Sequence, residues 1–131
     1  GRPDMAPYMF TESILKGKSI KKFGDGHTSR DYTYVDDIVS GIMSAIDFKC
    51  NYEIFNLGNN DSISLNTFIS TVESITKKKA EIIQMPLQSG DVEKTFADIS
   101  KARKYLNYDP KTKFSVGIEK FIKWYKKKRI K

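Results

Sequence analysis

The stretch Ser29-Arg30-Asp31-Tyr32-Thr33-Tyr34-Val35-Asp36-Asp37-Ile38-Val39 changes its hydrophobic period part-way along. From Arg30 to Tyr34 aromatic residues alternate with polar ones, a pattern typical of a strand. From about Asp36 to Asp47 the spacing becomes helical, and two carboxylates in the first turn suit the helix dipole. The apolar stripe of this helix is Ile38, Val39, Ile42 and Ile46. The stretch therefore predicts a short strand followed by a helix.

Further strands and helices are predicted on both sides of this stretch. Strands are expected at 20–23, closed by the turn Gly24-Asp25-Gly26, and at 52–57 and 80–85. Helices are expected at 4–16, after a capping Ser64, from a capping Asp98 to a left-handed Asn107, and from about 115 into the C-terminal tail. The apolar faces of the last three are Leu65, Phe68, Ile69, Val72 and Ile75, then Ile99, Ala102 and Leu106, then Phe114, Ile118, Phe121, Ile122 and Tyr125. Because strands and helices alternate, the fold class is α/β.

The strand predicted at 52–57 is apolar on both faces, through Ile54, Phe55 and Leu57. That pattern is typical of a strand inside a parallel sheet. The other predicted strands are too few and too short to flank it, so the sequence indicates part of a larger fold. Marginal stability or self-association through the exposed surface is the expected consequence.

Composition and charge exclude several classes of protein. The 131 residues suffice for one domain, and 39% hydrophobic residues argue against general disorder. One cysteine, Cys50, excludes an internal disulfide framework, and one histidine, His27, disfavours a zinc site. No apolar run approaches the roughly 20 residues of a membrane span, and the first residues do not resemble a signal peptide. We therefore expect a cytoplasmic protein.

The net charge of +7 is concentrated at the C-terminal end. Residues 120–131 contain seven basic residues and no acidic one, and the rest of the chain is neutral. A basic tail without interleaved aromatic stacking residues favours solubility or a weak polyanion contact over a specific nucleic-acid site.

No catalytic or metal-binding constellation is evident in the sequence. His27 lies in a turn without a nucleophile or an orienting carboxylate nearby, and Asp36 and Asp37 are better explained as residues at a helix start. Gly24-Asp25-Gly26 lacks a third glycine at position 29, and none of the seven tyrosines is followed by lysine four residues later. We expect no catalytic residue in this chain.

Two segments have the chemistry of binding. Arg30 could hold phosphate oxygens with its guanidinium, or could form an ion pair with Asp31 or Asp36. The loop Gln88-Ser89-Gly90-Asp91 could offer a carboxylate to a ribose diol, or could be a plain turn.

Six motifs together resemble the C-terminal half of extended short-chain dehydrogenase/reductase nucleotide-sugar enzymes, most closely UDP-glucuronate 4-epimerases. They are Gly1-Arg2-Pro3-Asp4-Met5-Ala6, Phe23-Gly24-Asp25-Gly26, the stretch 29–39, Phe55-Asn56-Leu57-Gly58-Asn59, Pro86-Leu87-Gln88-Ser89-Gly90-Asp91-Val92 and Ala97-Asp98-Ile99-Ser100-Lys101-Ala102. The resemblance implies one C-terminal substrate-binding domain over 1–131, a small mixed α/β unit that lacks most of the Rossmann sheet, with a basic tail at 120–131.

The resemblance also implies a partner, a cofactor and a substrate. In such enzymes a Rossmann half binds NAD, which oxidises the sugar at C4. The 4-keto sugar then rotates in the pocket, and the hydride is returned to its other face. That half is absent here, so this chain alone is expected neither to bind NAD nor to be active. A homodimer of the intact enzyme is compatible with the resemblance, and neither membrane nor specific nucleic acid is expected as a partner.

The resemblance implies substrate-binding roles for seven residues. Arg30 would contact the diphosphate of a UDP-sugar, and Gln88 and Asp91 would lie over the diphosphate and ribose. Lys21, Phe23 and Ile63 would lie near the uracil or the nucleotide, and Arg2 near the sugar carboxylate. Alternatives are the corresponding half of a dTDP-sugar 4,6-dehydratase or of another UDP-sugar epimerase, or a non-catalytic polyanion-binding module that uses the basic tail.

Overall fold

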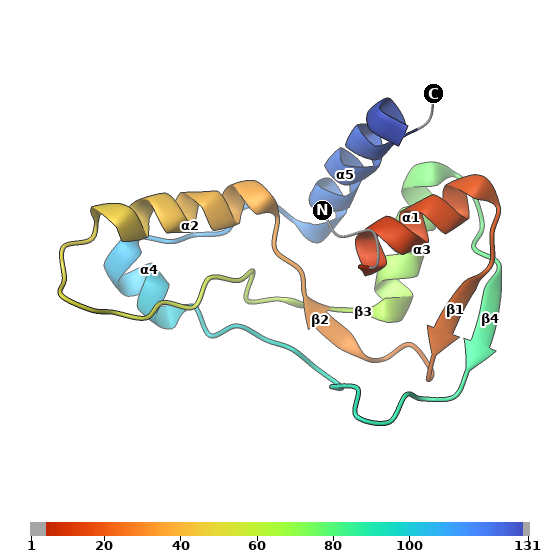
Figure 1. The fold of residues 1–131 in the computed structure, drawn as a ribbon, viewed down its shortest axis with the longest axis horizontal. Helices are drawn as coiled ribbons and strands as arrows, with labels where there is room; N and C mark the ends of the chain where they lie inside the picture. The colour runs from red at the N-terminus through yellow and green to blue at the C-terminus, as the bar shows by residue number, and fades with distance from the viewer. Residues whose placement is uncertain (1–4, 130–131) are drawn as a thin grey trace.

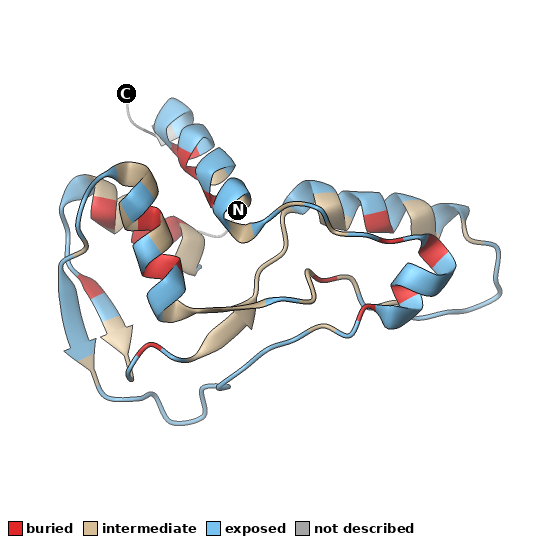
Figure 2. Ribbon diagram, turned by 180° about the vertical axis from the view of Figure 1, so that it is seen from behind, coloured by how far each residue is buried: buried red, intermediate tan, exposed pale blue. Residues whose placement is uncertain are grey.

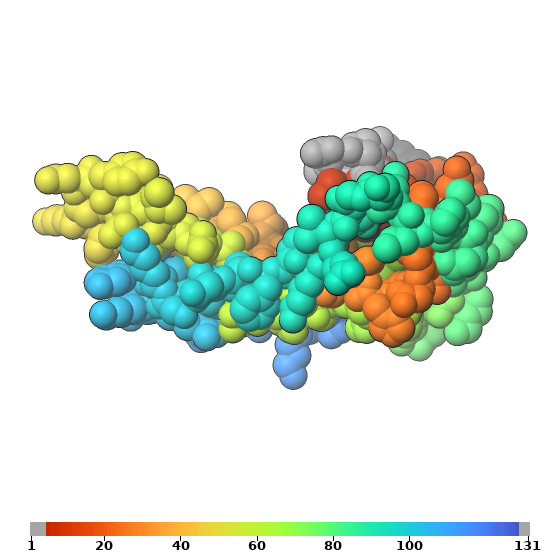
Figure 3. All heavy atoms as spheres, turned by 90° about the horizontal axis from the view of Figure 1, so that it is seen from below, coloured from red at the N-terminus to blue at the C-terminus, as the bar shows by residue number. Residues whose placement is uncertain are grey.

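The computed structural model describes residues 5–129 and has an elongated shape with two lobes (Figures 1 and 3). The large lobe contains α1 (Ala6–Lys16), β1 (Ile20–Phe23), α3 (Leu65–Thr76), β4 (Ile82–Met85) and α5 (Phe114–Arg129). The small lobe contains α2 (Val35–Asp47), the loop 48–57 and α4 (Ser100–Leu106). Between them lie β2 (Ser29–Asp31) and β3 (Ser62–Ser64). The mixture of helices with short strands confirms the α/β class.

Among residues 5–129 the strands form two separate pairs. β1 runs parallel to β4, with Ile20 opposite Ile82 and Phe23 opposite Met85. β2 runs antiparallel to β3, with Arg30 opposite Ile63. The segment 93–95 adds a third strand-like piece beside β2, because the Ser29 N–H donates to the Glu93 carbonyl at 2.8 Å. These pairs position the residues that sequence analysis singled out for binding.

The large lobe is built on the predicted helical faces. Ser64 caps α3, since its hydroxyl accepts the Thr67 N–H at 3.1 Å, and left-handed Gly17 ends α1. The buried sides of α1, α3 and α5 face one another (Figure 2). Their shared core consists of Phe10, Ile14, Ile20, Phe68, Ile69, Val72, Ile118 and Ile122.

The small lobe has its own, smaller core. Ile99, Ala102, Leu106 and Tyr108 are buried there against Leu57 and neighbouring aromatic rings. As predicted, Asn107 is left-handed, with φ 51°, and ends α4. Asp98 lies one residue before the cap position Ile99, but its carboxylate still accepts the Ser100 N–H at 2.9 Å.

Two sequence predictions differ from the structure in this lobe. The predicted strand at 52–57 is wrong, because no other segment among residues 5–129 forms a ladder with it. Most of the predicted stripe of α2 is exposed, and Ile46 is 69% exposed. Both differences have one cause: the described residues provide no sheet for these apolar groups to pack against.

Two further strand boundaries differ from the prediction, and one strand was not predicted. The strand expected over 30–34 is only β2, the strand expected over 80–85 begins at Ile82, and β3 was not predicted. None of the helices in the described part of the chain is long and apolar enough to cross a membrane.

Candidate functional site

A glycine turn connects β1, which carries the candidate residues Lys21 and Phe23, to β2. Gly24 and Gly26 both have positive φ, 64° and 86°, which side chains rarely adopt. A Cβ on Gly26 would lie 2.1 Å from the Asn66 Oδ1, so this turn packs closely on α3. Just before the turn, Lys21 and Phe23 occupy alternate positions of β1 and therefore point to the same face.

Arg30 and Ile63 lie opposite each other across the β2–β3 pair. The Arg30 Nη1 donates to the Ser29 carbonyl at 2.9 Å, and Nη2 donates to the Asp91 Oδ1 at 2.5 Å. Both terminal nitrogens of the guanidinium are therefore held by hydrogen bonds, and the Arg30 side chain remains 31% exposed. A cation held in place and still open to solvent can bind an anion without first being ordered.

The loop 86–92 crosses beside this arginine. The Asp91 N–H donates to the Gln88 carbonyl at 3.2 Å, which closes a turn that includes Gly90 at φ 82°. The Gln88 side chain is exposed in that turn. Through the Asp91 carboxylate the loop is tied to β2, so Arg30, Ile63, Gln88 and Asp91 are brought together.

The remaining predicted residues are not part of this group, although Phe23 lies opposite Met85, the residue before the loop 86–92. Lys21 and Phe23 belong to the other strand pair, and Arg2 lies outside the described residues. The alternative prediction, an ion pair of Arg30 with Asp31 or Asp36, is wrong, because Arg30 forms its ion pair with Asp91.

The Asp31 carboxylate instead connects three separate segments of the chain. Its Oδ1 accepts the Asn59 N–H at 2.9 Å, and its Oδ2 accepts the Asn60 N–H at 3.1 Å and the Ala97 N–H at 3.0 Å. Gly58 approaches so closely that an added Cβ would lie 2.3 Å from the Ala97 Cβ. The carboxylate therefore fixes the end of β2 on which Arg30 depends.

The sequence predicts neither this role of Asp31 nor a second role of Asp37. The Asp37 carboxylate accepts the Lys111 and Thr112 N–H groups at 3.2 and 3.1 Å. In addition to its place in the first turn of α2, Asp37 therefore connects α2 to the segment that precedes α5. Neither contact leaves a local sequence signal, because the donors are backbone groups far along the chain.

A half-buried tyrosine, Tyr32, and a buried one, Tyr108, border this framework. Burial raises the pKa of Tyr32, and the nearby Arg30 charge partly opposes that rise. Burial also raises the pKa of Tyr108, and the Asp37 and Asp31 charges add to the effect. The Tyr108 hydroxyl donates to the Gly58 carbonyl at 2.9 Å. Both tyrosines are therefore neutral structural groups at ordinary pH.

The described residues do not fit a dinucleotide cofactor. The Gly24–Gly26 turn leads into β2, whereas a dinucleotide loop leads into a helix whose N-terminus faces the pyrophosphate. Among residues 5–129 no group of three or more His, Cys, Asp or Glu side chains could hold a metal ion. The group of this site that could bind an anion is therefore the Arg30 guanidinium.

Comparison with known proteins gives consistent matches. The sequence model of the GDP-mannose 4,6 dehydratase family matches residues 7–121. A UDP-glucuronate 4-epimerase of Thermodesulfobacterium geofontis is 41% identical over 127 residues, 96% of this chain and 39% of its own length. An uncharacterized protein of Methanocaldococcus jannaschii is 45% identical over 95% of this chain and 38% of its own length.

Solved structures agree with these sequence matches. The UDP-glucuronic acid 4-epimerase of Bacillus cereus, in complex with UDP-glucuronic acid and NAD, matches with a TM-score of 0.85 and 37% identity. That match covers 94% of this chain and 41% of the Bacillus chain. The chain thus spans about two fifths of the length of these relatives. It belongs to the extended short-chain dehydrogenase/reductase family of nucleotide-sugar epimerases and dehydratases, and matches the C-terminal part of that family.

Proposed function

We propose that this chain is the UDP-sugar-binding half of an NAD-dependent nucleotide-sugar 4-epimerase that interconverts UDP-glucuronate and UDP-galacturonate. The observation that carries the proposal is Arg30, a partly exposed guanidinium fixed between the Ser29 carbonyl and the Asp91 carboxylate. Relatives named UDP-glucuronate 4-epimerase, 38 to 41% identical to this chain, favour a uronic acid as the sugar.

Arg30 would contact the diphosphate. A guanidinium has five N–H donors, and the two contacts at Ser29 and Asp91 leave others for phosphate oxygens. Asp91 would hold Arg30 in place before the nucleotide arrives and would then accept the ribose hydroxyls, because a carboxylate repels phosphate. Gln88, in the same turn, would add a neutral hydrogen bond near the diphosphate.

The apolar part of the nucleotide would lie against the strands. Ile63 is opposite Arg30 on β3 and supplies an apolar neighbour. Phe23 and Lys21, on one face of β1, would border the uracil, and Arg2 would reach the sugar carboxylate. The hydride chemistry and NAD would lie in the rest of the intact protein, so this chain alone would be inactive.

The test is titration of the 131-residue chain with UDP, followed by backbone amide chemical shifts. The shifts should concentrate at residues 29–31, 62–64 and 88–91. Arg30→Ala should weaken UDP binding about tenfold or more, because a charge-assisted hydrogen bond contributes about 1.5–3 kcal/mol. Arg103→Ala, which removes an exposed arginine of α4, is the matched control and should leave the affinity unchanged.

Two further measurements sharpen the assignment. Gln88→Arg should tighten UDP if the loop lies over the diphosphate, and UDP-glucuronate should bind more tightly than dTDP-glucose. Equal UDP affinity of Arg30→Ala and the unmodified chain would show that Arg30 serves only to tie the loop to β2. Turnover of UDP-glucuronate by the chain above a blank would contradict the proposed division of labour.

A further inference from the structure

The loop 86–92, which carries Asp91, is attached at its two ends to different strand pairs. At the first end, the Gly24 N–H donates to the last carbonyl of β4 at 3.0 Å. At the second end, the segment 93–95 lies parallel to β2. The place of Asp91 relative to Arg30 therefore depends on how this segment is attached to β2.

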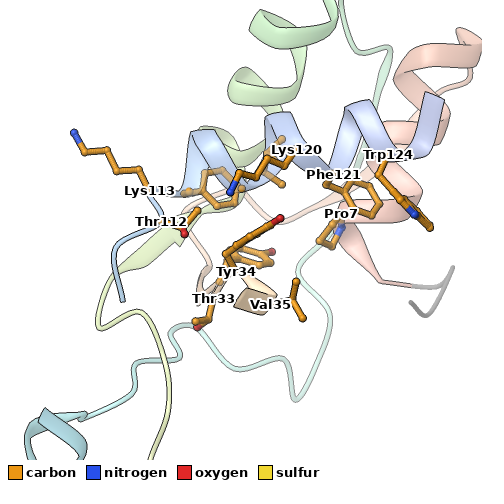
Figure 4. A pocket seen from close by; sticks show the side chains of 13 residues that line it. Pro7, Thr33, Tyr34, Val35, Thr112, Lys113, Lys120, Phe121 and Trp124 are labelled. Carbon is orange, nitrogen blue, oxygen red and sulfur yellow. The ribbon is translucent and has the colours of Figure 1, made fainter. Parts of the chain in front are cut away.

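β2 itself is held in place by the large lobe. It pairs with β3, and the Tyr32 ring directly after it packs against the Phe68 and Phe114 rings, with centroids 5.2 and 5.4 Å apart. From there the chain continues through Tyr34, which lines a groove beside α5 (Figure 4). β2 is therefore the fixed frame, and the segment that follows the loop has to be positioned on it.

Thr95 makes this attachment with its N–H, its hydroxyl and its carbonyl. The N–H donates to the Ser29 carbonyl at 3.1 Å, and the hydroxyl oxygen accepts the Asp31 N–H at 3.0 Å. The carbonyl accepts the Ser62 hydroxyl of β3 at 2.6 Å. Thr95 therefore contacts the residues on both sides of Arg30 in β2.

The contact of the Thr95 hydroxyl departs from a regular ladder. Between parallel strands the Asp31 N–H would donate to the Thr95 carbonyl, because each residue of one strand bonds to two residues of its neighbour. Here the side-chain oxygen takes the place of that carbonyl, and the carbonyl is bonded to Ser62 instead. The hydroxyl therefore determines how the end of the ladder is arranged.

We propose that Thr95 is a positioning residue for the nucleotide site: its hydroxyl fixes the segment after the loop so that the Asp91 carboxylate meets Arg30. The inference rests on the proposed function, in which the Arg30 guanidinium binds the diphosphate. Without the hydroxyl, the Asp31 N–H would take the Thr95 carbonyl from Ser62 or bond to water, and the segment would shift on β2.

Such a shift acts on the guanidinium more than on the stability of the fold. Asp91 lies four residues before Thr95, so its Oδ1 would move relative to the Arg30 Nη2 that it holds. Thr95 is exposed, and water can therefore satisfy the released Asp31 N–H at little cost to the fold. Binding of an anion would suffer, because Arg30 would no longer be ordered before the anion arrives.

The test compares two variants of Thr95. Thr95→Val nearly keeps the shape of the side chain and removes the hydroxyl, whereas Thr95→Ser keeps the hydroxyl. In calorimetric titration of the 131-residue chain with UDP, Thr95→Val should bind about fivefold more weakly, which is the scale of one neutral hydrogen bond. Thr95→Ser should stay within about twofold of the unmodified chain.

A matched control removes a threonine hydroxyl elsewhere. The Thr76 hydroxyl donates to the Val72 carbonyl at 2.8 Å in the last turn of α3, at the end of the helix far from β3. Thr76→Val should leave the UDP affinity unchanged.

Non-additivity separates positioning from a general weakening of the fold. In an Arg30→Ala background, Thr95→Val should cause less than about a twofold further loss of UDP affinity, because the hydroxyl acts through the guanidinium. A general weakening of the fold would reduce the affinity by the same factor in both backgrounds.

A readout without nucleotide distinguishes this inference from the proposed function. The heteronuclear NOE of the Arg30 Nε–Hε group reports how firmly the guanidinium is held on the picosecond-to-nanosecond timescale. It should be high in the unmodified chain and in Thr95→Ser. In Thr95→Val it should fall toward the value of Arg103, an exposed arginine of α4.

Three results would overturn the inference: an unchanged Arg30 NOE in Thr95→Val, an equal loss of UDP affinity in Thr95→Ser, or additive losses of Thr95→Val and Arg30→Ala. An unchanged UDP affinity of Arg30→Ala would instead refute the proposed function. In that case a lowered Arg30 NOE in Thr95→Val would still support Thr95 as the residue that positions the guanidinium.

Discussion

Asp31 is the carboxylate whose removal should cost the fold most. Asp31→Ala leaves three backbone N–H groups, those of Asn59, Asn60 and Ala97, without their acceptor. Hydrogen bonds to a charged group contribute about 1.5–3 kcal/mol each when buried, and water can replace part of them at this half-buried position. We expect the free energy of unfolding to fall by about 3–4 kcal/mol, a large part of the about 5–15 kcal/mol of a typical domain.

Asp31→Asn provides a milder version of the same test. The amide can place its oxygen where Oδ2 accepts two N–H groups, but its NH₂ then faces the Asn59 N–H. The expected loss is about 1–2 kcal/mol. If Asp31→Ala does not fold, this variant still measures the contribution of the carboxylate.

The assay is urea unfolding at pH 7, followed by circular dichroism and extrapolated linearly to water. Asp61→Ala removes an exposed aspartate from the neighbouring loop and should change the free energy of unfolding by less than about 0.5 kcal/mol. A loss for Asp31→Ala no larger than that of Asp61→Ala would refute the reasoning that this carboxylate holds the three segments together.

Three other predictions concern separate parts of the chain. The Ala80 N–H donates to the Glu73 carboxylate at 2.8 Å, and this bond is the main cause of the lowered pKa of Glu73. The ionised carboxylate therefore stabilises the fold at pH values above the ordinary glutamate pKa of about 4.3, and this stabilisation is lost as the pH falls through the lowered pKa. In urea unfolding, Glu73→Gln should therefore differ from the unmodified chain at pH 6 and converge with it in acid; a constant difference would contradict this. Tyr108→Phe removes the hydrogen bond from the buried hydroxyl to the Gly58 carbonyl, so the free energy of unfolding should fall by about 1–1.5 kcal/mol and the thermal unfolding midpoint should fall with it. An unchanged midpoint would show that water replaces the bond. Ile46→Glu, on the exposed apolar face of α2, should reduce any concentration-dependent association in sedimentation velocity; a compact monomer at all concentrations before the change would count against that surface as the contact.

Local patterns predicted those elements whose cause is local. Ser64 followed by apolar residues at helical spacing predicted α3, because the N-cap and the apolar face of a helix both lie within one continuous segment. The left-handed Asn107 is a comparable case. The family resemblance likewise rested on continuous motifs.

The failures concern groups whose partners lie far along the chain. The strand predicted at 52–57 needs a neighbouring sheet, and its own residues cannot supply one. Asp91 lies 61 residues from Arg30, so their ion pair could not be read from either motif. The same applies to Asp31, whose acceptor role depends on where two distant loops return.

The two separate cores have a consequence for how the molecule opens. Within the described residues, the core cluster of the large lobe contains eight buried residues and that of the small lobe contains four. Segments with fewer buried contacts unfold locally at a lower free-energy cost. In native-state hydrogen exchange, the amides of α4 should therefore exchange through partial opening events while those of α3 exchange only on global unfolding. The end of β2, where Asp31 accepts the Asn59, Asn60 and Ala97 N–H groups, would mark the boundary between the two cooperative units.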